Sequence, residues 1–418
     1  MSKSDDDVNI NINEGGESDE NINEYKSYRE RIRLQEERAR KILKLQEDIG
    51  QMTCKERIFF DEMGSTKSFD EFESGILFYG GERQRSYITF NPTTNKYQSF
   101  NMEESRFKHA AVTLNDGTVM LIGGLMAEHV ERPKAWERYN PSIIKWIPAT
   151  NEFEILFIDN KGDQLESQFI GYGMAAVLID NDRVFICGGS HRYQCLRDCY
   201  IFNLRDKTLT RVADMIYHRK FHTASLLRDG KVLICGGIGY HKNSNDVLDV
   251  VLNSTEIYDP ISNTVIEGIP MIKFRYCHTA TTLNDGRVFL FGGDTDYNQL
   301  VADDDDVPDE YKNVSKTSEF FFNNRFSDGP RTTVGKMRHV AVLLPDNSVF
   351  IAGGTDERMR GSTLIFKPNE EIEGERAKER FKDGPYLDFN VANHCIGCHF
   401  KKIPLNFIDD KCNNNNNQ

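Results

Sequence analysis

The stretch "LLRDGKVLICGG", residues 226–237, contains a turn signal at Asp229-Gly230, then a run of apolar residues and a final glycine pair. Asp-Gly between apolar segments is typical of the tight turn of a β-hairpin. Two close copies occur, "LNDGTVMLIGG" ending at Gly124 and "LNDGRVFLFGG" ending at Gly293. The chain is therefore expected to consist of repeated β-hairpins.

Glycine pairs mark six copies of this unit, and five copies share further residues at fixed distances from the pair. The pairs are Gly80-Gly81, Gly123-Gly124, Gly188-Gly189, Gly236-Gly237, Gly292-Gly293 and Gly353-Gly354. Four residues before the pair stand Val119, Val184, Val232, Val288 and Val349. Twelve residues before it stand Ala111, Ala176, Ala224, Ala280 and Ala341. Chance does not produce such a register, so these glycines are interpreted as structural residues of a repeat.

Each copy predicts four strands. The segment before the Asp-Gly turn is the first strand, and the apolar run that ends in the glycine pair is the second. A third strand closes in an aromatic residue and often a proline, as in "EIYDP" to Pro260, and a fourth follows, as in "TVIEGIPM". In the second copy the third strand is expected at "ERYNP", ending at Pro141, with Trp146 in the fourth. Four strands per copy without an open edge predict radial closure.

This pattern resembles the kelch repeat, which builds β-propellers of the galactose oxidase-like central domain superfamily, over about residues 70–385. The resemblance implies an all-β, six-bladed kelch-type β-propeller. The first copy, "FDEFESGILFYGG", has no recognisable first strand. A C-terminal strand within "YLDFNVANHCIGCHF" is expected to replace it and close the ring.

Four segments are expected along the chain. Residues 1–24 are acidic and polar, and are expected to be disordered. Residues 25–50 favour a helix with a mildly apolar stripe, either a short coiled coil or a solvated helix. The propeller is expected over residues 57–405, and an Asn-rich disordered tail over 406–418.

The composition narrows the classes of function. The formal net charge of −13 argues against nucleic acid as a partner. No stretch of 18 apolar residues occurs, so no membrane span is expected. The acidic N-terminus is unlike a signal peptide, and nine scattered cysteines fit a reducing compartment. We expect a cytoplasmic protein, with the nucleus as the alternative.

The order of the strands predicts where a binding surface lies. The segment before each first strand and the loop after each glycine pair should share one end of the propeller. Seventeen residues before the pair, this end should carry Arg106, Arg219, Arg275 and Lys336. These cations either receive carboxylates from an acidic segment of a protein partner or pair with carboxylates of neighbouring blades. Tyr240 and Tyr297, in the longest loops, are placed on the same partner-binding face.

Histidine recurs three residues after each of these cations, at His109, His222, His278 and His339. Because it recurs at one strand position whatever the adjoining loop, we expect it to be structural.

Two further motifs are weak indications of a metal-binding site. Asp294, Asp296 and Asn298 resemble the start of a calcium loop, but the later ligand positions depart from it, which favours a solvated acidic loop. "HCIGCH" places Cys395 and Cys398 between His394 and His399, which fits c-type haem attachment or zinc. Its strand-like spacing favours a closing strand with buried thiols.

No catalytic motif is recognised in the sequence. We expect a non-enzymatic scaffold or adaptor for protein–protein interaction, without a cofactor, that binds its partner through the face with the loops after the glycine pairs. The alternative is an enzyme or metal-dependent oxidase of the galactose oxidase-like type, with a site at the channel mouth, since the resemblance includes copper oxidases.

Overall fold

The chain divides into two units, Met1–Ser68 and Phe69–Gln418. A computed structural model describes part of the second unit: residues 74–81, 86–102, 106–126, 138–139, 142–158, 171–191, 194–243, 249–295, 314–354, 362–372, 375–387 and 396–401. The segments 1–24, 25–50 and 406–418 lie outside these residues, as does the beginning of the expected propeller. Every helix or strand within the described residues is a β-strand.

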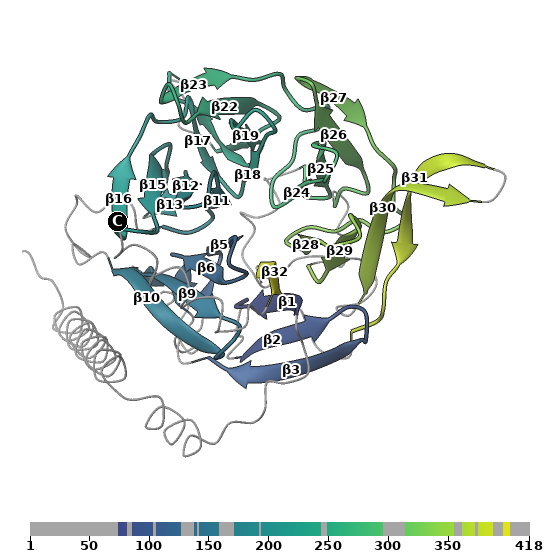
Figure 1. Ribbon diagram of the computed structural model, residues 1–418. Helices are drawn as coiled ribbons and strands as arrows, with labels where there is room; N and C mark the ends of the chain where they lie inside the picture. The colour runs from purple at the N-terminus through teal and green to yellow at the C-terminus, as the bar shows by residue number, and fades with distance from the viewer. Residues whose placement is uncertain are drawn as a thin grey trace, which may run out of the picture. The chain divides into compact units, whose positions relative to one another are not determined.

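The strands form six four-stranded antiparallel sheets within the described residues, arranged in a ring like the blades of a kelch propeller (Figure 1). From the centre outward, sheet 1 contains β32 (Ile396–Lys401), β1 (Ser74–Tyr79), β2 (Ser86–Asn91) and β3 (Lys96–Asn101). Sheet 2 contains β5 (Ala110–Thr113), β6 (Val119–Ile122), β9 (Ser142–Ile147) and β10 (Glu152–Ile158). Sheet 3 contains β11 (Ala175–Leu178), β12 (Arg183–Cys187), β15 (Cys199–Asn203) and β16 (Thr208–Arg211).

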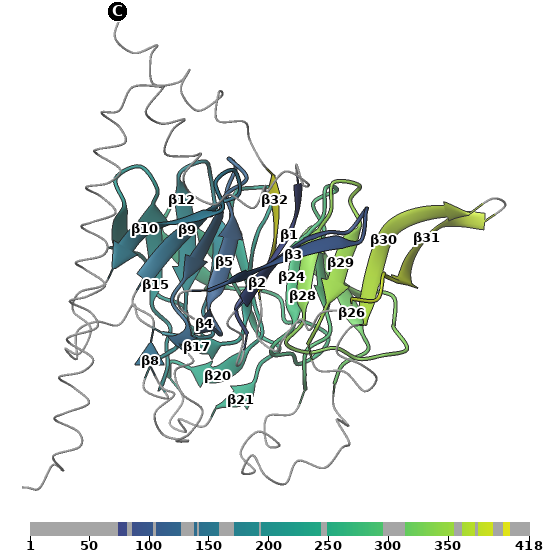
Figure 2. The same ribbon diagram turned by 90° about the horizontal axis from the view of Figure 1, so that it is seen from below.

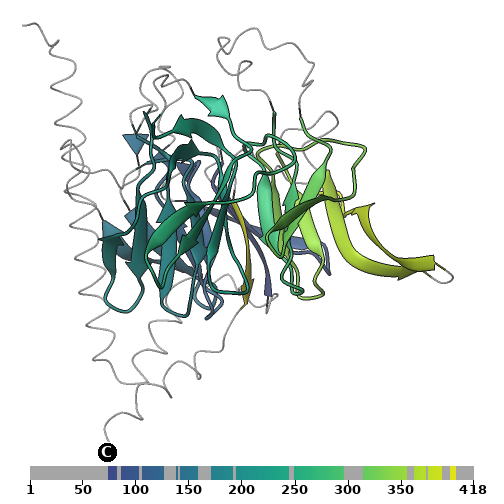
Figure 3. The same cartoon turned by 90° about the horizontal axis from the view of Figure 1, so that it is seen from above.

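The other three sheets repeat this order. Sheet 4 contains β18 (Thr223–Leu226), β19 (Val232–Cys235), β22 (Thr255–Asp259) and β23 (Thr264–Glu267). Sheet 5 contains β24 (Thr279–Thr282), β25 (Val288–Phe291), β26 (Ser318–Phe322) and β27 (Arg325–Asp328). Sheet 6 contains β28 (Val340–Leu343), β29 (Val349–Ala352), β30 (Thr363–Ile372) and β31 (Glu375–Asp383). The hairpin of β30 and β31 extends beyond the rim (Figure 3).

The inner strands contact one another all the way round: β32 contacts β5, and the contacts continue through β11, β18, β24 and β28 back to β32. β32 pairs with β1, with Cys398 opposite Leu77. The prediction that a C-terminal strand replaces the missing first strand is therefore confirmed. Cys398 is buried in this strand and His399 is half-buried, whereas His394 and Cys395 lie outside the described residues.

The second copy differs from the expected pattern. Its third strand is β9, which contains Trp146, while β8 (Arg138–Tyr139) joins a small separate sheet. Ile143 and Trp146 are fully buried in β9, and Ile144 pairs with Leu121 of β6. Burial of this apolar run decides the pairing, so the aromatic-proline signal at Pro141 was misleading and Trp146 does not lie in a fourth strand.

The core lies between neighbouring sheets. The second strands are buried throughout, as their continuous apolar runs predict. Between sheets 5 and 6, the rings of Phe289 and Phe366 stack with centroids 4.1 Å apart. The hairpin turns also follow the sequence: Gly230 has a φ of 82°, and in the sixth copy Asn347 takes the same place with a φ of 66°. Asn is the residue that best replaces Gly in this conformation.

Candidate functional site

One end of the ring carries additional short strands. β4 (Arg106–Phe107) pairs with β7 (Leu125–Met126), which pairs with β8, and β17 (Tyr217–Lys220) pairs with β20 (Ile238–His241), which pairs with β21 (Val250–Val251). β13 (Ser190–His191) and β14 (Gln194–Cys195) form a third small sheet. The β4–β7 and β17–β20 pairings join the segment before a first strand to the loop after a glycine pair, as the order of the strands predicts. We call this the loop-bearing end (Figure 2).

The glycine pairs join neighbouring sheets at this end. A Cβ added to Gly188 would lie 2.5 Å from the carbonyl oxygen of Arg219 and 2.6 Å from Cε1 of His222, both in the segment that leads into the next sheet. The N–H of Gly189 donates a 2.7 Å hydrogen bond to that same carbonyl. The contact recurs from Gly237 to Arg275 and from Gly293 to Lys336. The glycines are therefore structural, because a side chain would separate the sheets.

The four predicted cations are buried. Arg106, Arg219, Arg275 and Lys336 are 0–1% exposed. Nε of Arg219 donates to Oε1 of Glu256 at 2.8 Å, and Nη1 donates to the Gly236 carbonyl at 2.8 Å. Arg275 makes the corresponding contact with Glu319 at 3.0 Å. The structure thus places these charges inside the protein, and the carboxylates that hold Arg219 and Arg275 belong to the same sheet, in place of the neighbouring blade that the sequence suggested.

Arg106 and Lys336 lie at the same position in sheets 2 and 6 and contact hydroxyl groups. Arg106 Nη2 donates to the Ser142 hydroxyl at 2.8 Å, and Lys336 Nζ donates to the Ser362 hydroxyl at 2.9 Å. These side chains bind the start of the third strand of their sheet. Because they do not reach the surface, they are not available to a partner's carboxylate.

The repeated histidines are structural, as expected. Nε2 of His278 lies 3.1 Å from Oγ1 of Thr223 in the preceding sheet, and Nε2 of His339 lies 2.9 Å from Oγ1 of Thr279. Nε2 of His222 lies 3.3 Å from Sγ of Cys187. Burial lowers the pKa of His222 and of His339 to about 3 and lowers those of His109 and His278 as well. All four side chains are therefore neutral near pH 7.

A pocket opens at the centre of the loop-bearing end, in front of the inner strands. Its lining includes the residue one position before each of these histidines and its counterpart in sheet 3, and we call it the axial pocket. These residues are Lys108, Gly173, Phe221, Cys277 and Arg338. All five have φ between 52° and 68°, and backbone hydrogen bonds of 2.7–3.0 Å link each to the next. These hydrogen bonds use the backbone groups between neighbouring residues, so the side chains largely determine what the pocket can bind.

Two cations lie at the axial pocket. Nζ of Lys108 lies 5.4 Å from the ring centroid of Tyr172 and 5.8 Å from that of Phe221. Nε of Arg338 is buried and makes no hydrogen bond within the described part of the chain. Burial raises the pKa of the Cys277 thiol to about 11, although Arg338 and Lys108 oppose that shift. The thiol is therefore protonated at neutral pH and is a poor nucleophile.

An apolar strip lies on the same end. We define it by Ile269, Ile272, Phe274 and Val250, whose side chains are 42–51% exposed. Two hydrogen bonds join residues 269–275 to the chain that follows β21. The N–H of Arg275 donates to the carbonyl of Leu252 at 3.2 Å, and that of Met271 donates to the carbonyl of Asn253 at 2.8 Å. Exposed apolar side chains concentrated in this way are typical of interaction surfaces.

Of the remaining predicted residues, those that the structure describes do not line the axial pocket. Tyr240 is half-buried and stacks on His218 with centroids 4.4 Å apart, and burial raises its pKa. Tyr297 lies outside the described residues, as do Asp296 and Asn298. Asp294 is buried and accepts a 3.4 Å hydrogen bond from the hydroxyl of Tyr276. The described residues contain no group of three or more His, Cys, Asp or Glu side chains placed to hold a metal ion.

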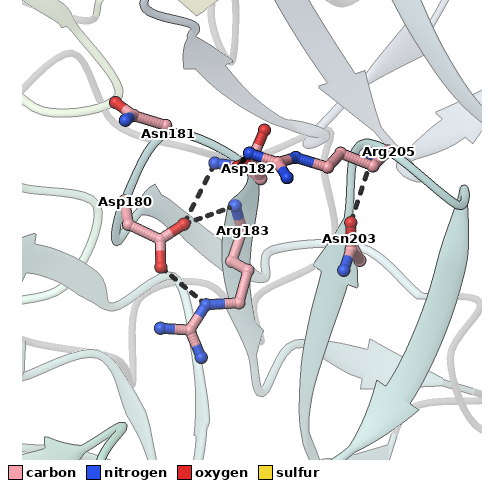
Figure 4. Close-up of a pocket in the computed structure, with 6 residues that line it drawn as sticks. All are labelled: Asp180, Asn181, Asp182, Arg183, Asn203 and Arg205. Atoms are coloured by element: carbon pink, nitrogen blue, oxygen red, sulfur yellow. Dashed lines mark hydrogen bonds and ion pairs between the residues drawn. The ribbon is translucent and has the colours of Figure 1, made fainter. Parts of the chain in front are cut away.

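A second pocket lies at the hairpin turns of sheet 3, at the opposite end of the ring (Figure 4). The carboxylate of Asp180 accepts hydrogen bonds from the N–H of Asp182 at 3.0 Å and from Nε of Arg183 at 2.6 Å. Asp182 in turn pairs with Arg205 at 2.5 Å. These charges neutralise one another within the turns, so this pocket shows no group directed toward a ligand.

The sequence did not single out Lys108, Cys277 or Arg338. A signal was present, because each stands fifteen residues before its glycine pair, two residues after the buried cation. Sequence spacing gives the strand position of a side chain but not the direction in which the chain turns next. The left-handed residue between the buried cation and the buried histidine was for this reason overlooked.

Comparison with known proteins supports the repeat. A family model of the Kelch motif matches residues 172–216, which include sheet 3, so the predicted resemblance to kelch repeats is confirmed. No curated protein matches the chain. Solved structures similar to the chain include that of YjhT, at 18% identity and a TM-score of 0.42, with coverage of 52% of this chain and 66% of that one. Within the described residues no helix is long and apolar enough to cross a membrane.

Proposed function

We propose that the protein is a non-enzymatic scaffold that binds a protein partner through its loop-bearing end. The chain carries a kelch motif within a ring of four-stranded sheets. We also propose that the ring is a single six-bladed kelch propeller, supported by the contacts that link all six inner strands. The cytoplasmic location, the N-terminal helix and the disordered terminal segments remain predictions from the sequence.

The apolar strip is the observation that carries this proposal. Its side chains contact water, and their burial by a partner would release that water. Each square ångström of apolar surface removed from water is worth about 25 cal/mol. Among the described residues, the hairpin turns at the other end carry exposed apolar side chains on separate sheets, among them Ile261 and Phe322.

The chemistry of the axial pocket also favours binding over catalysis. Nε2 of three of its histidines contacts the preceding sheet, and burial keeps these side chains neutral. Its thiol is protonated at neutral pH. A ligand here would meet two cations and aromatic rings, which recognise charge and shape.

Substitutions in the apolar strip test the proposal. We expect Phe274→Ser and Ile272→Ser to reduce capture of specific partners from a lysate of cells that express the protein, measured by quantitative mass spectrometry. Ile261→Ser is the matched control, because Ile261 is 93% exposed in the turn between β22 and β23, at the opposite end. Unchanged capture by both strip variants would contradict the proposal. Stoichiometric copper in the purified protein would favour the metal-dependent oxidase instead.

A further inference from the structure

The apolar strip and the axial pocket are consecutive along the chain. Phe274 belongs to the strip, and Cys277, three residues later, lines the pocket. Three residues span at most about 10 Å. One extended peptide of a few residues can therefore contact both surfaces at once.

The positive charge of the pocket lies on one side of it. Lys108 leads into sheet 2 and Arg338 into sheet 6, and these two sheets flank sheet 1. In sheets 4 and 5 the third strand supplies Glu256 and Glu319. At the matching register the third strands of sheets 2 and 6 hold Ile144 and Leu364, so they add no carboxylate beside the pocket.

Arg338 has a donor that suits a ligand. Its buried Nε makes no hydrogen bond within the described residues, and an unsatisfied buried donor is costly. The carboxylate of Asp294 is close enough to raise the pKa of Cys277, but it accepts a hydrogen bond from Tyr276 and does not line the pocket. Arg338 also lines the pocket, so a carboxylate from outside could accept a hydrogen bond from its guanidinium group and lie beside Lys108.

We propose that the loop-bearing end recognises an extended acidic segment of a protein partner, with an Asp or Glu carboxylate between Lys108 and Arg338 and apolar side chains a few residues away over Ile272 and Phe274. This inference rests on the proposed function and specifies the chemistry of the partner. In this inference Lys108 and Arg338 select the negative charge of the partner, in place of the four buried cations that the sequence suggested.

A peptide library tests it with the full chain. Random twelve-residue peptides displayed on phage are selected against the purified protein, and enriched sequences are synthesised with a fluorescent label for anisotropy measurements. We expect Asp or Glu within two to five positions of a large apolar residue. We expect Arg338→Gln and Lys108→Gln each to weaken binding about ten-fold, with Arg338→Lys retaining part of it.

Matched controls separate the two surfaces. Lys242→Gln removes an exposed cation at the same end, outside the pocket, and Ile261→Ser removes an apolar side chain at the other end; both should bind normally. Phe274→Ser should weaken binding while circular dichroism stays unchanged. Selected peptides that lack acidic residues but depend on Phe274 would overturn this inference and leave the proposed function standing. Peptides whose binding is insensitive to both Arg338 and Phe274 would contradict both the inference and the proposed function.

Discussion

In four of the pairs the first glycine leaves space for two groups from the next sheet, a carbonyl oxygen and an imidazole ring; these glycines are Gly80, Gly188, Gly236 and Gly292. Gly188 shows this with Arg219 and His222, and Gly236 shows it with Arg275 and His278. Their φ values near 60° add a second requirement for glycine. The glycine pair therefore recurs along this chain for two separate physical reasons: the backbone conformation and the space needed by the neighbouring sheet.

Replacing Gly188 with Ala should destabilise the protein by about 3 kcal/mol or more, because the added Cβ meets backbone and ring atoms that cannot move without separating two sheets. Gly230→Ala is the control. Its φ is also positive, but nothing lies within 4 Å of the added Cβ, so only the conformational cost of about 1 kcal/mol applies. Thermal unfolding followed by circular dichroism compares them, and equal losses would show that contact with the next sheet does not matter.

The buried histidines should make stability depend on pH. Burial lowers the pKa of His222 to about 3 from the 6.5 of the unfolded chain. Between these values the unfolded chain binds a proton that the folded protein does not, so stability is complete above pH 6.5 and falls as the pH decreases toward 3. Each such histidine contributes about 1.4 kcal/mol per pH unit. Between pH 6.5 and 5, urea unfolding of His222→Gln should show a shallower pH dependence than the parent protein; an identical slope would be inconsistent with a neutral buried His222.

At the scale of elements, sheets 2, 4, 5 and 6 are each held at the loop-bearing end by one cation that contacts the beginning of the third strand of the same sheet. In sheet 4 this cation is Arg219, whose partner Glu256 also accepts hydrogen bonds from the N–H groups of Ile216 and Tyr217. The carboxylate thus joins the segment before the first strand to the third strand. A buried pair of this kind contributes little net stability as a whole, but the loss of one member leaves an uncompensated charge.

Glu256→Gln should therefore cost about 3–5 kcal/mol of unfolding free energy, since Arg219 would remain buried without its counter-charge. Asp182→Asn is the control, because the Asp182–Arg205 pair is exposed at the turns and should contribute about 1 kcal/mol or less. Denaturant midpoints measure both. If Glu256→Gln were as stable as the control, the pair would not hold the sheet. Arg219→Glu would likewise destabilise the folded protein, so this variant cannot be used to test partner binding.

At the scale of the whole molecule, closure of the ring depends on pairing between distant parts of the chain. β32 supplies the inner strand of sheet 1 and contacts the inner strands β5 and β28 on either side. Its residues Cys398 and Phe400 are buried. Without β32, the edge of β1 and the apolar faces of sheets 2 and 6 would meet water.

Truncation after residue 395 should therefore lower the thermal midpoint by roughly 10 °C or more and promote aggregation. Truncation after residue 405 should leave the midpoint unchanged, because it removes only the Asn-rich tail and keeps β32. Scanning calorimetry and size-exclusion chromatography distinguish the outcomes. A protein truncated after residue 395 with an unaltered midpoint would show that β32 does not close the ring.

The repeat, the hairpins and the closing strand could be predicted from sequence, since Asp-Gly turns, glycine pairs and valines recur at fixed distances. The environment of the cations could not. Glu256 lies 37 residues from Arg219, and only the pairing of three strands brings them together. Glutamates in "STEIYDP" and "TSEFFFN" recur at one position of the third strand in two copies, which was a usable signal for an internal pair. Trp146 was assigned to the wrong strand because the aromatic-proline signal at Pro141 competes with the apolar run of β9, and burial of that run decides the pairing.

The backbone ring around the axis has a consequence for how such proteins diversify. Its five described positions require a left-handed conformation and a peptide group, yet they carry Lys, Gly, Phe, Cys and Arg. Folding thus constrains the main chain at these positions and leaves the choice of side chain open. Single substitutions, in evolution or by design, can therefore change the binding specificity of the pocket without changing the backbone.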